Sequence, residues 1–336
     1  MNAVSNTNSI ASEATLPISD ICDVSVVLVN YNTEHLLERV FAALFAARQS
    51  LTMQTIVIDN ASRDNSVTLL RSRYPDVELI ANASNVGFGR ANNQALPRIR
   101  GRYVLLLNTD AFVAEDTLTK TFAYMDGHPR CGVLGVRLAG ESGTLQPSCR
   151  YFPTPLNVFV AENGLGRLFP TVQMIDDMSW DHAGTRACDW VPGCFYLIRK
   201  SAIDQVGLFD PRFFVYYEEV DHCRRIRQAG WQVTYFGDAT VVHIGGESAK
   251  ADDRLTAAGR QIARLQVESE MLYFRKHHGL TGLLASLALT CCGAGLDLLK
   301  DLVRPRKDRP RHAQLQKLKL AFSLLGPTGW ATRPTR

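Results

Sequence analysis

The sequence has little of what marks several common protein classes. Its eight cysteines include no C-x-x-C pair, which excludes a zinc ribbon and a thioredoxin-type redox motif, and we interpret them as reduced thiols. The first twenty residues contain neither a basic start nor a long apolar run, so they are not a secretory signal. The net charge is only +4, without a dense basic stripe, and we expect no nucleic-acid partner.

Two phosphate-binding motifs are also absent. No G-x-G-x-x-G follows the first apolar run and no Gly-rich Walker loop occurs anywhere, which argues against a dinucleotide dehydrogenase and a P-loop NTPase. What is present is the composition of a globular protein, with 46% hydrophobic and 21% charged residues. A chain of 336 residues has room for about two structural units.

Apolar runs alternate with helical patterns through the first 125 residues. We expect strands at 24–29, 54–59, 77–81 and 102–108, and helices at 34–48, 64–73, 88–96 and 115–125. This alternation predicts an α/β fold with a doubly wound, mainly parallel sheet. Further along we expect an irregular stretch with a short hairpin at 132–185, strands at 190–199, 232–236 and 240–243, and helices at 218–229 and 252–276.

Polar residues gather where the first four strands end. Ligands of such sheets bind beyond the carboxyl ends of the strands. Helix capping explains some polar residues there, but four clusters together favour a nucleotide-binding edge, where glycines let the backbone approach a ligand. The residues concerned are Asn30, Asn32, Asp59, Asn85, Gly87, Asn108 and Asp110.

Six motifs carry a family resemblance. They are VVLVNYN (26–32), IDNAS (58–62), NVGFGRANN (85–93), LNTD (107–110), GLFDPRFFVYYEEVD (207–221) and VHIGGES (242–248). In this order they resemble family 2 glycosyltransferases of the bacterial rhamnosyltransferase-like branch, over about residues 22–278. The resemblance implies a GT-A fold with a Rossmann-like nucleotide-binding half, a nucleoside-diphosphate-sugar donor, a divalent cation and inverting transfer to a hydroxyl.

The resemblance also implies roles for the donor-side residues. Asn30 and Asn32 match the loop over the base, and Asp59 matches the residue that reads the base. Asn85 and Asn92 match the loop at the ribose and diphosphate, which also contains Gly87.

Two residues match the metal ligands of the family. Asp110 ends a D-x-D-like signature whose first position is Asn108 here, and His243 is the second ligand. Oxygen ligands suit Mn²⁺ and Mg²⁺, and an imidazole shifts the preference toward Mn²⁺. The alternative for His243 is a structural histidine with satisfied hydrogen bonds.

Three acids cluster at the expected start of helix 218–229. The resemblance places the catalytic base at Glu219, with Glu218 and Asp221 as supporting acids. The alternative is that acids only complement the helix dipole there. Asp221 can also pair with Arg224 or Arg225, one helical turn further on.

Two further residues resemble the acceptor-side segment of the family. They are Trp190 and Gly193, and Gly193 leaves room for an acceptor beside the backbone. We interpret the neighbouring Cys194 as a small core residue, because inverting transfer needs no nucleophile on the enzyme.

The C-terminal region combines an apolar stretch with a basic one. Residues 280–296 carry no charge, and residues 300–336 hold ten Lys or Arg against two Asp, a balance of +8. A helix across a bilayer needs about 20 residues. Three interpretations stay open: an element lying on the membrane, a membrane span, and ordinary packing on the domain. The basic segment suggests an anionic membrane surface as a partner.

These observations divide the chain into a disordered lead (1–21), a nucleotide-sugar-binding half (22–130), an acceptor-side and catalytic half (131–250) and a helical, basic, membrane-associating region (251–336). We expect a cytoplasmic enzyme, peripheral on the inner face of the plasma membrane. It would transfer a sugar, with rhamnose as the expected one, from a dTDP- or UDP-sugar to a lipid-linked or glycan acceptor. A sugar nucleotidyltransferase and a non-catalytic nucleotide-sugar-binding protein remain as alternatives.

Overall fold

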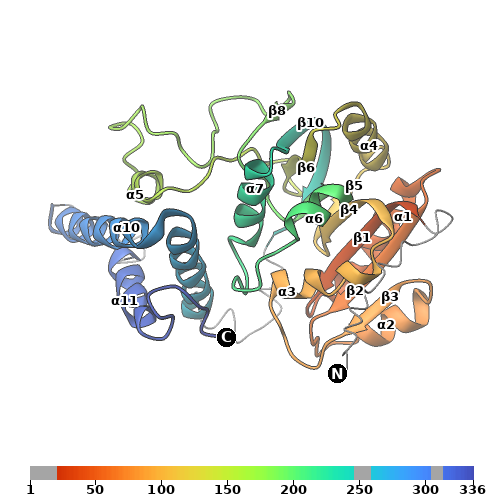
Figure 1. Cartoon of the computed structure of the whole chain (residues 1–336), viewed down its shortest axis with the longest axis horizontal. Coiled ribbons are helices and arrows are strands. Elements are labelled where there is room, and N and C mark those ends of the chain that lie inside the picture. The colour runs from red at the N-terminus through yellow and green to blue at the C-terminus, as the bar shows by residue number, and fades with distance from the viewer. Residues whose placement is uncertain (1–20, 246–258, 304–312) are drawn as a thin grey trace, which may run out of the picture.

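The computed structural model describes residues 21–245, 259–303 and 313–336, so residues 1–20 of the predicted lead (1–21) and part of the basic segment lie outside it. One mixed sheet runs through the protein in the order β3-β2-β1-β4-β9-β6-β10-β5 (Figure 1). The strands of this sheet are β1 Cys22–Asn30, β2 Met53–Asp59, β3 Glu78–Ala81, β4 Gly101–Asn108, β5 Ala111–Val113, β6 Cys131–Ala139, β9 Phe195–Arg199 and β10 Gln232–His243. Two short strands, β7 Leu145–Gln146 and β8 Arg186–Ala187, pair with β6 and β10.

The first four strands are parallel, as the alternation predicted. Their apolar side chains are buried on both faces, because helices cover both sides of the sheet. The helices of this half are α1 Glu34–Arg48, α2 Ser66–Arg73, α3 Phe88–Asn93 and α4 Thr117–Gly127. The mainly parallel α/β prediction is confirmed, with β9 antiparallel to both β4 and β6.

The prediction of an irregular stretch at 132–185 is wrong at its start. β6 is a nine-residue central strand, and its two glycines hid it from the pattern. A Cβ on Gly132 would lie 2.7 Å from Trp231, and a Cβ on Gly135 would lie 2.5 Å from Val191. Glycine therefore marks close packing here, and not a loop. The expected hairpin is present as β6–β7, and the helix α5 Pro155–Glu162 was missed.

Two other expected strands differ in extent. The run 190–199 is extended only over β9, because Pro192 and Gly193 interrupt it. The two runs 232–236 and 240–243 form one strand, β10, whose pairing with β6 shifts between Phe236 and Thr240. Between β9 and β10 lie α6 Lys200–Val206, which was not predicted, and α7 Glu218–Gln228, which was.

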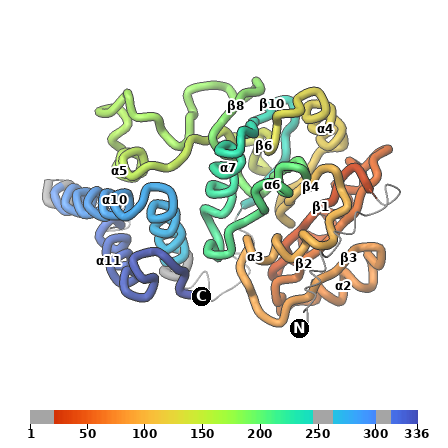
Figure 2. Tube along the Cα trace, in the orientation of Figure 1, coloured from red at the N-terminus to blue at the C-terminus, as the bar shows by residue number. Residues whose placement is uncertain are grey.

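The two C-terminal helices, α10 and α11, pack together with α5 and form a helical group beside the sheet (Figure 2). α10 runs from Gly259 to Val303 with a kink at Gly279, where φ is 68°. It continues through the apolar stretch 280–296, beyond the predicted end at 276. α11 Ala313–Leu325 packs against α10. In the described part of the chain, one helical segment, Ala263–Leu299, is long and apolar enough to cross a membrane.

Gly135 gives a direct test of the packing at β6. We expect Gly135→Ala to destabilise the protein by about 1–3 kcal/mol, because the added Cβ overpacks against Val191. Chemical denaturation followed by circular dichroism measures this loss. Gly140→Ala is the matched control, since its Cβ would meet only ordinary contacts at 3.7 Å. Equal stability of the two variants would contradict the packing.

Candidate active site

The pairing of β5 with β10 brings two predicted ligands together. These strands are antiparallel, with Ala111 opposite His243, so Asp110 lies at the end of β10. Asp110 Oδ1 and His243 Nε2 are 3.5 Å apart, and both side chains are largely buried. Asp110 Oδ2 also accepts from the Gly245 backbone N–H at 3.1 Å. One carboxylate and one imidazole therefore face each other at the carboxyl edge of the sheet.

Gln146 sets the orientation of the His243 ring. Its amide nitrogen donates to the His243 carbonyl at 2.8 Å, which turns its amide oxygen toward His243 Nδ1, also at 2.8 Å. In the neutral ring Nδ1 then carries the proton, and Nε2 is left as a lone-pair donor beside Asp110. The donor set of this pair fits a divalent cation that takes its other ligands from a diphosphate. Among the described residues, no group of three or more potential ligands occurs.

The donor-side residues form a hydrogen-bonded network at the ends of β1 and β2. Asn30 donates to Asp59 Oδ2 at 2.8 Å and to Ser62 at 3.0 Å. Asp59 Oδ1 accepts from the Ser62 N–H at 2.9 Å, and Asn32 accepts from the Arg63 N–H at 2.7 Å. Asn30 and Asp59 are almost completely buried. The network thus ties the loops after both strands into one rigid edge.

The loop after β3, which contains Asn85 and Gly87, is held by similar side-chain hydrogen bonds. Asn85 Oδ1 accepts from the Gly87 N–H and from the Asn60 side chain, both at 2.9 Å. Asn92 is buried and donates to the Phe88 carbonyl within α3 at 3.0 Å. At Gly87 φ is 90°, and a Cβ there would lie 2.4 Å from the Phe214 carbonyl oxygen. Position 87 therefore needs glycine for the close approach of the segment before α7, and the predicted ligand contact of Gly87 stays a prediction.

Two acids open α7 in a buried setting. Glu218 is 4% exposed, while Glu219 is half-buried and lines a cleft. Burial raises the pKa of Glu218 well above its usual range, with a second contribution from Glu219. Burial also raises the pKa of Glu219, whereas Arg150 lowers it. Both acids therefore hold their protons to higher pH than an exposed glutamate does, and Glu219 is the one that lines the cleft.

The backbone directly before Glu218 and Glu219 is strained, and it fixes the direction in which α7 begins. Tyr216 and Tyr217, directly before α7, both adopt left-handed conformations, with φ of 69° and 67°. Such values in non-glycine residues cost of the order of 1–3 kcal/mol each and persist only where the surroundings hold them. Tyr217 donates to Glu270 of α10 at 3.3 Å. The C-terminal helices thus contact the turn that presents Glu219.

Asp221 has a structural position. It accepts from Arg225 at 2.9 Å and from His277 at 2.7 Å, and it contacts Lys276. Burial alone would raise its pKa, but these partners outweigh burial and lower the pKa to about 2. Of the two arginines considered from the sequence, Arg225 is the partner. Asp221 therefore joins α7 to α10 and does not face the cleft.

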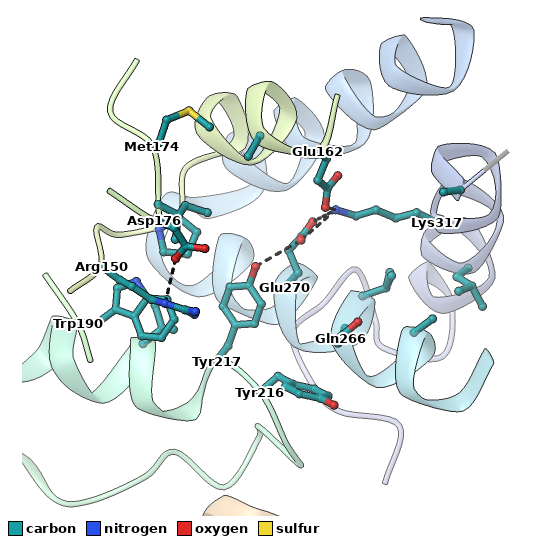
Figure 3. Close-up of a pocket in the computed structure, with 18 of the residues that line it drawn as sticks. Arg150, Glu162, Met174, Asp176, Trp190, Tyr216, Tyr217, Gln266, Glu270 and Lys317 are labelled. Carbon is teal, nitrogen blue, oxygen red and sulfur yellow. Dashed lines mark hydrogen bonds and ion pairs between the residues drawn. The ribbon is translucent and has the colours of Figure 1, made fainter. Parts of the chain in front are cut away.

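A cleft of about 1320 Å³ lies between α7, α5, α10 and α11 (Figure 3). Glu219 and Trp190 line this cleft, together with Tyr216 and Tyr217. The ring of Trp190 lies 4.7 Å from the Arg150 guanidinium, and its N–H donates to the Tyr151 carbonyl. The predicted Gly193 is outside this wall and lies beside Phe88.

One short segment connects the cleft with the Asp110–His243 pair. Trp190 lies in the cleft, and the carbonyl of Cys194 accepts from the Asn108 N–H at 3.0 Å. Four residues span at most about 14 Å, so the cleft and the end of β4 are near neighbours. Cys194 is buried, as expected for a core residue, and burial raises its pKa to about 12.

No sequence motif identified several of the residues that form this site. Gln146 lies in a two-residue strand of the hairpin, and Arg150 lies in an irregular segment. Lys317 looked like part of a basic tail, yet it is largely buried and bonded to Glu162 at 2.6 Å and Glu270 at 2.9 Å. The only sequence signal was a lysine inside an apolar helical pattern, which also fits a solvated face.

The chain is similar in sequence to known glycosyltransferases. The family model of glycosyl transferase family 2 matches residues 25–180. An N-acetylglucosaminyl-diphospho-decaprenol L-rhamnosyltransferase of Mycobacterium tuberculosis is 28% identical over 240 residues, 68% of this chain and 78% of that protein. The rhamnosyltransferase WbbL of Escherichia coli is 27% identical over 196 residues, 54% of this chain and 70% of that protein.

A solved structure supports the fold. The mannosyltransferase PcManGT of Pyrobaculum calidifontis, determined with GDP-Man and Mn²⁺, superposes with a TM-score of 0.54 at 16% identity, over 97% of this chain and 92% of that one. The similarity thus extends beyond the family match to the C-terminal helices. The chain matches glycosyl transferase family 2 over residues 25–180, has a GT-A-type fold and is a glycosyltransferase.

Proposed function

We propose that this glycosyltransferase moves a sugar, with inversion, from a nucleoside-diphosphate donor to a hydroxyl of a lipid-linked cell-surface glycan. The observation that carries the proposal is Glu219, a half-buried glutamate in a cleft that one short segment connects to the Asp110–His243 pair. Rhamnose from dTDP-rhamnose is the proposed donor sugar, because two of the similar proteins are named rhamnosyltransferases. The lipid-linked acceptor rests on the name of the mycobacterial relative.

Asp110 and His243 would hold a divalent cation at the donor diphosphate. When bound, such an ion supplies charge neutralisation for the departing nucleoside diphosphate. The neutral His243 ring, oriented by Gln146, favours Mn²⁺ over Mg²⁺ as the ion. Asn108 and the segment at Cys194 fix the backbone that leads to Asp110.

The proposed base is Glu219. Inversion in one displacement requires the acceptor hydroxyl to lose its proton as it attacks the anomeric carbon. A carboxylate within hydrogen-bond reach can take that proton. Glu218 is more deeply buried and has a pKa raised well above its usual range, whereas Glu219 lines the cleft where an acceptor hydroxyl can reach it. Asp221 supports this arrangement by holding α7 in place.

The donor-side residues would bind the nucleotide along the edge of β1 and β2. Asp59 is proposed to read the base and Asn85 to order the ribose and diphosphate loop. Their hydrogen bonds to Asn30, Asn60 and Gly87 already fix both loops, so little ordering remains to be done when the donor binds. The proposed contacts of Asn32, Gly87 and Asn92 belong to the same edge.

The membrane is the proposed location, on the cytoplasmic side. One face of α10 beyond the kink packs in the protein through Leu283 and Leu287, while Leu280 and Leu284 are 43% and 46% exposed. Leu298, Leu299 and Phe322 add exposed apolar area. This half-packed helix next to the +8 segment fits an element lying on an anionic surface.

The donor and the cation are tested together. We expect release of nucleoside diphosphate from a panel of dTDP-, UDP- and GDP-sugars to require Mn²⁺ or Mg²⁺ and to stop in EDTA. Asp110→Asn should lower turnover by at least about 10²-fold, since losing a metal ligand costs several kcal/mol in the transition state. Full turnover in EDTA would rule out the Asp110–His243 role.

The base is tested by a matched pair of variants. Glu219→Gln should lower kcat by about 10²–10⁴-fold with donor affinity unchanged. Glu218→Gln should cost much less, because Glu218 is buried and is not among the residues that line the cleft. Burial raises the pKa of Glu219, so kcat/KM should rise with pH through a pKa above the usual glutamate range. Glu219→Gln should lose this acid limb. The opposite ranking of the two variants would assign the base to Glu218.

The membrane location is tested by co-sedimentation with vesicles containing anionic lipid. A Leu280→Glu/Leu284→Glu double variant should bind at least tenfold more weakly, since each buried leucine contributes about 1.5–3 kcal/mol. High salt should weaken binding of the unmodified protein. Leu168→Glu is the control, as Leu168 is 74% exposed outside the C-terminal helices. Binding that is unaffected in the double variant would reject this surface.

A further inference from the structure

The cleft is larger than transfer to a single sugar requires. Its volume is about 1320 Å³, whereas clefts of about 300–1,000 Å³ hold drug-sized ligands. Glu219 marks the catalytic side, and α10 and α11 form the opposite wall. A ligand whose reacting hydroxyl lies at Glu219 can therefore extend toward the C-terminal helices.

The charges of the cleft do not favour an anionic ligand. Four acids and three cations line it: Glu162, Asp176, Glu219 and Glu270 against Arg150, Lys317 and Lys319. Two of the cations are already neutralised, Arg150 by Asp176 at 2.9 Å and Lys317 by Glu162 and Glu270 (Figure 3). A diphosphate would find one exposed lysine and a surplus of carboxylates, so the lining suits an uncharged ligand.

The other residues that line the cleft suit an uncharged ligand rich in hydroxyl groups. Trp190, Tyr216 and Tyr217 supply aromatic surface near Glu219. Gln266 of α10 and Gln316 of α11 are exposed to the cleft, and neither amide has a hydrogen-bond partner in the described part of the chain. Each amide both donates and accepts, as a ring carrying several hydroxyls requires.

We infer that the cleft is an extended acceptor site for a glycan of more than one sugar unit. The terminal sugar presents its hydroxyl to Glu219, and the preceding sugars lie along α10 and α11, where Gln266 and Gln316 bind them. The inference rests on the proposed function and narrows it, because it assigns acceptor recognition to the C-terminal helices. Any lipid diphosphate then lies beyond the cleft.

The test is an acceptor series with a common terminal sugar. Bacterial surface-glycan fragments of one, two and three sugars are attached to farnesyl diphosphate or to a neutral octyl tail, and transfer is measured with each. We expect KM to fall with each added sugar on either tail. A Gln266→Ala/Gln316→Ala double variant should raise KM for the three-sugar acceptor about tenfold, with kcat and the one-sugar KM unchanged. Gln228→Ala, exposed at the far end of α7, is the matched control.

Several results would overturn the inference. One is equal KM for one and three sugars in the unmodified protein. Another is an equal effect of the double variant on the one-sugar acceptor, which would mean general damage to the site. A KM that depends on the farnesyl diphosphate and not on glycan length would mean recognition of phosphate. Failure to transfer to any acceptor would instead reject the proposed function, on which the inference rests.

Discussion

The buried carboxylate of Asp221 joins α7, which begins with Glu218 and Glu219, to the C-terminal helices. It is completely buried and bonded to Arg225 of α7 and to His277 of α10, with Lys276 beside it. Removing one partner from such a buried cluster costs about 3–5 kcal/mol. The cleft exists only while α10 stays against α7, so both the wall opposite Glu219 and the burial that sets its pKa depend on this contact.

A second buried network continues the connection to α11. Lys317 bonds to Glu162 of α5 and Glu270 of α10, and Glu270 accepts from Tyr217 in the turn before the acids. That turn stores backbone strain at Tyr216 and Tyr217 and needs support from its surroundings. The exposed apolar face of α10 belongs to the same helix. The proposed membrane-facing surface and the position of the proposed base, Glu219, therefore both depend on one packed group of helices.

The sequence predicted the donor half well because its signals are local. The alternation of apolar runs located the first four strands, and polar residues after them located the edge with Asn30, Asp59 and Asp110. What it missed depends on contacts far apart in the chain. Gly135 resembled a loop residue because Val191, which requires it, is 56 residues away in sequence. Gln146 and Lys317 acquire their roles only when the hairpin reaches His243 and α11 reaches α5.

The most direct test of the account is the position of a bound ion and donor product. Crystals grown with Mn²⁺ and a nucleoside diphosphate, and measured with anomalous scattering from manganese, locate both at once. The account predicts a manganese peak between Asp110 Oδ1 and His243 Nε2, with the diphosphate on the side of the Trp190–Cys194 segment that leads to Glu219. A nucleotide bound elsewhere, or an ordered diphosphate with no ion at this pair, would contradict it.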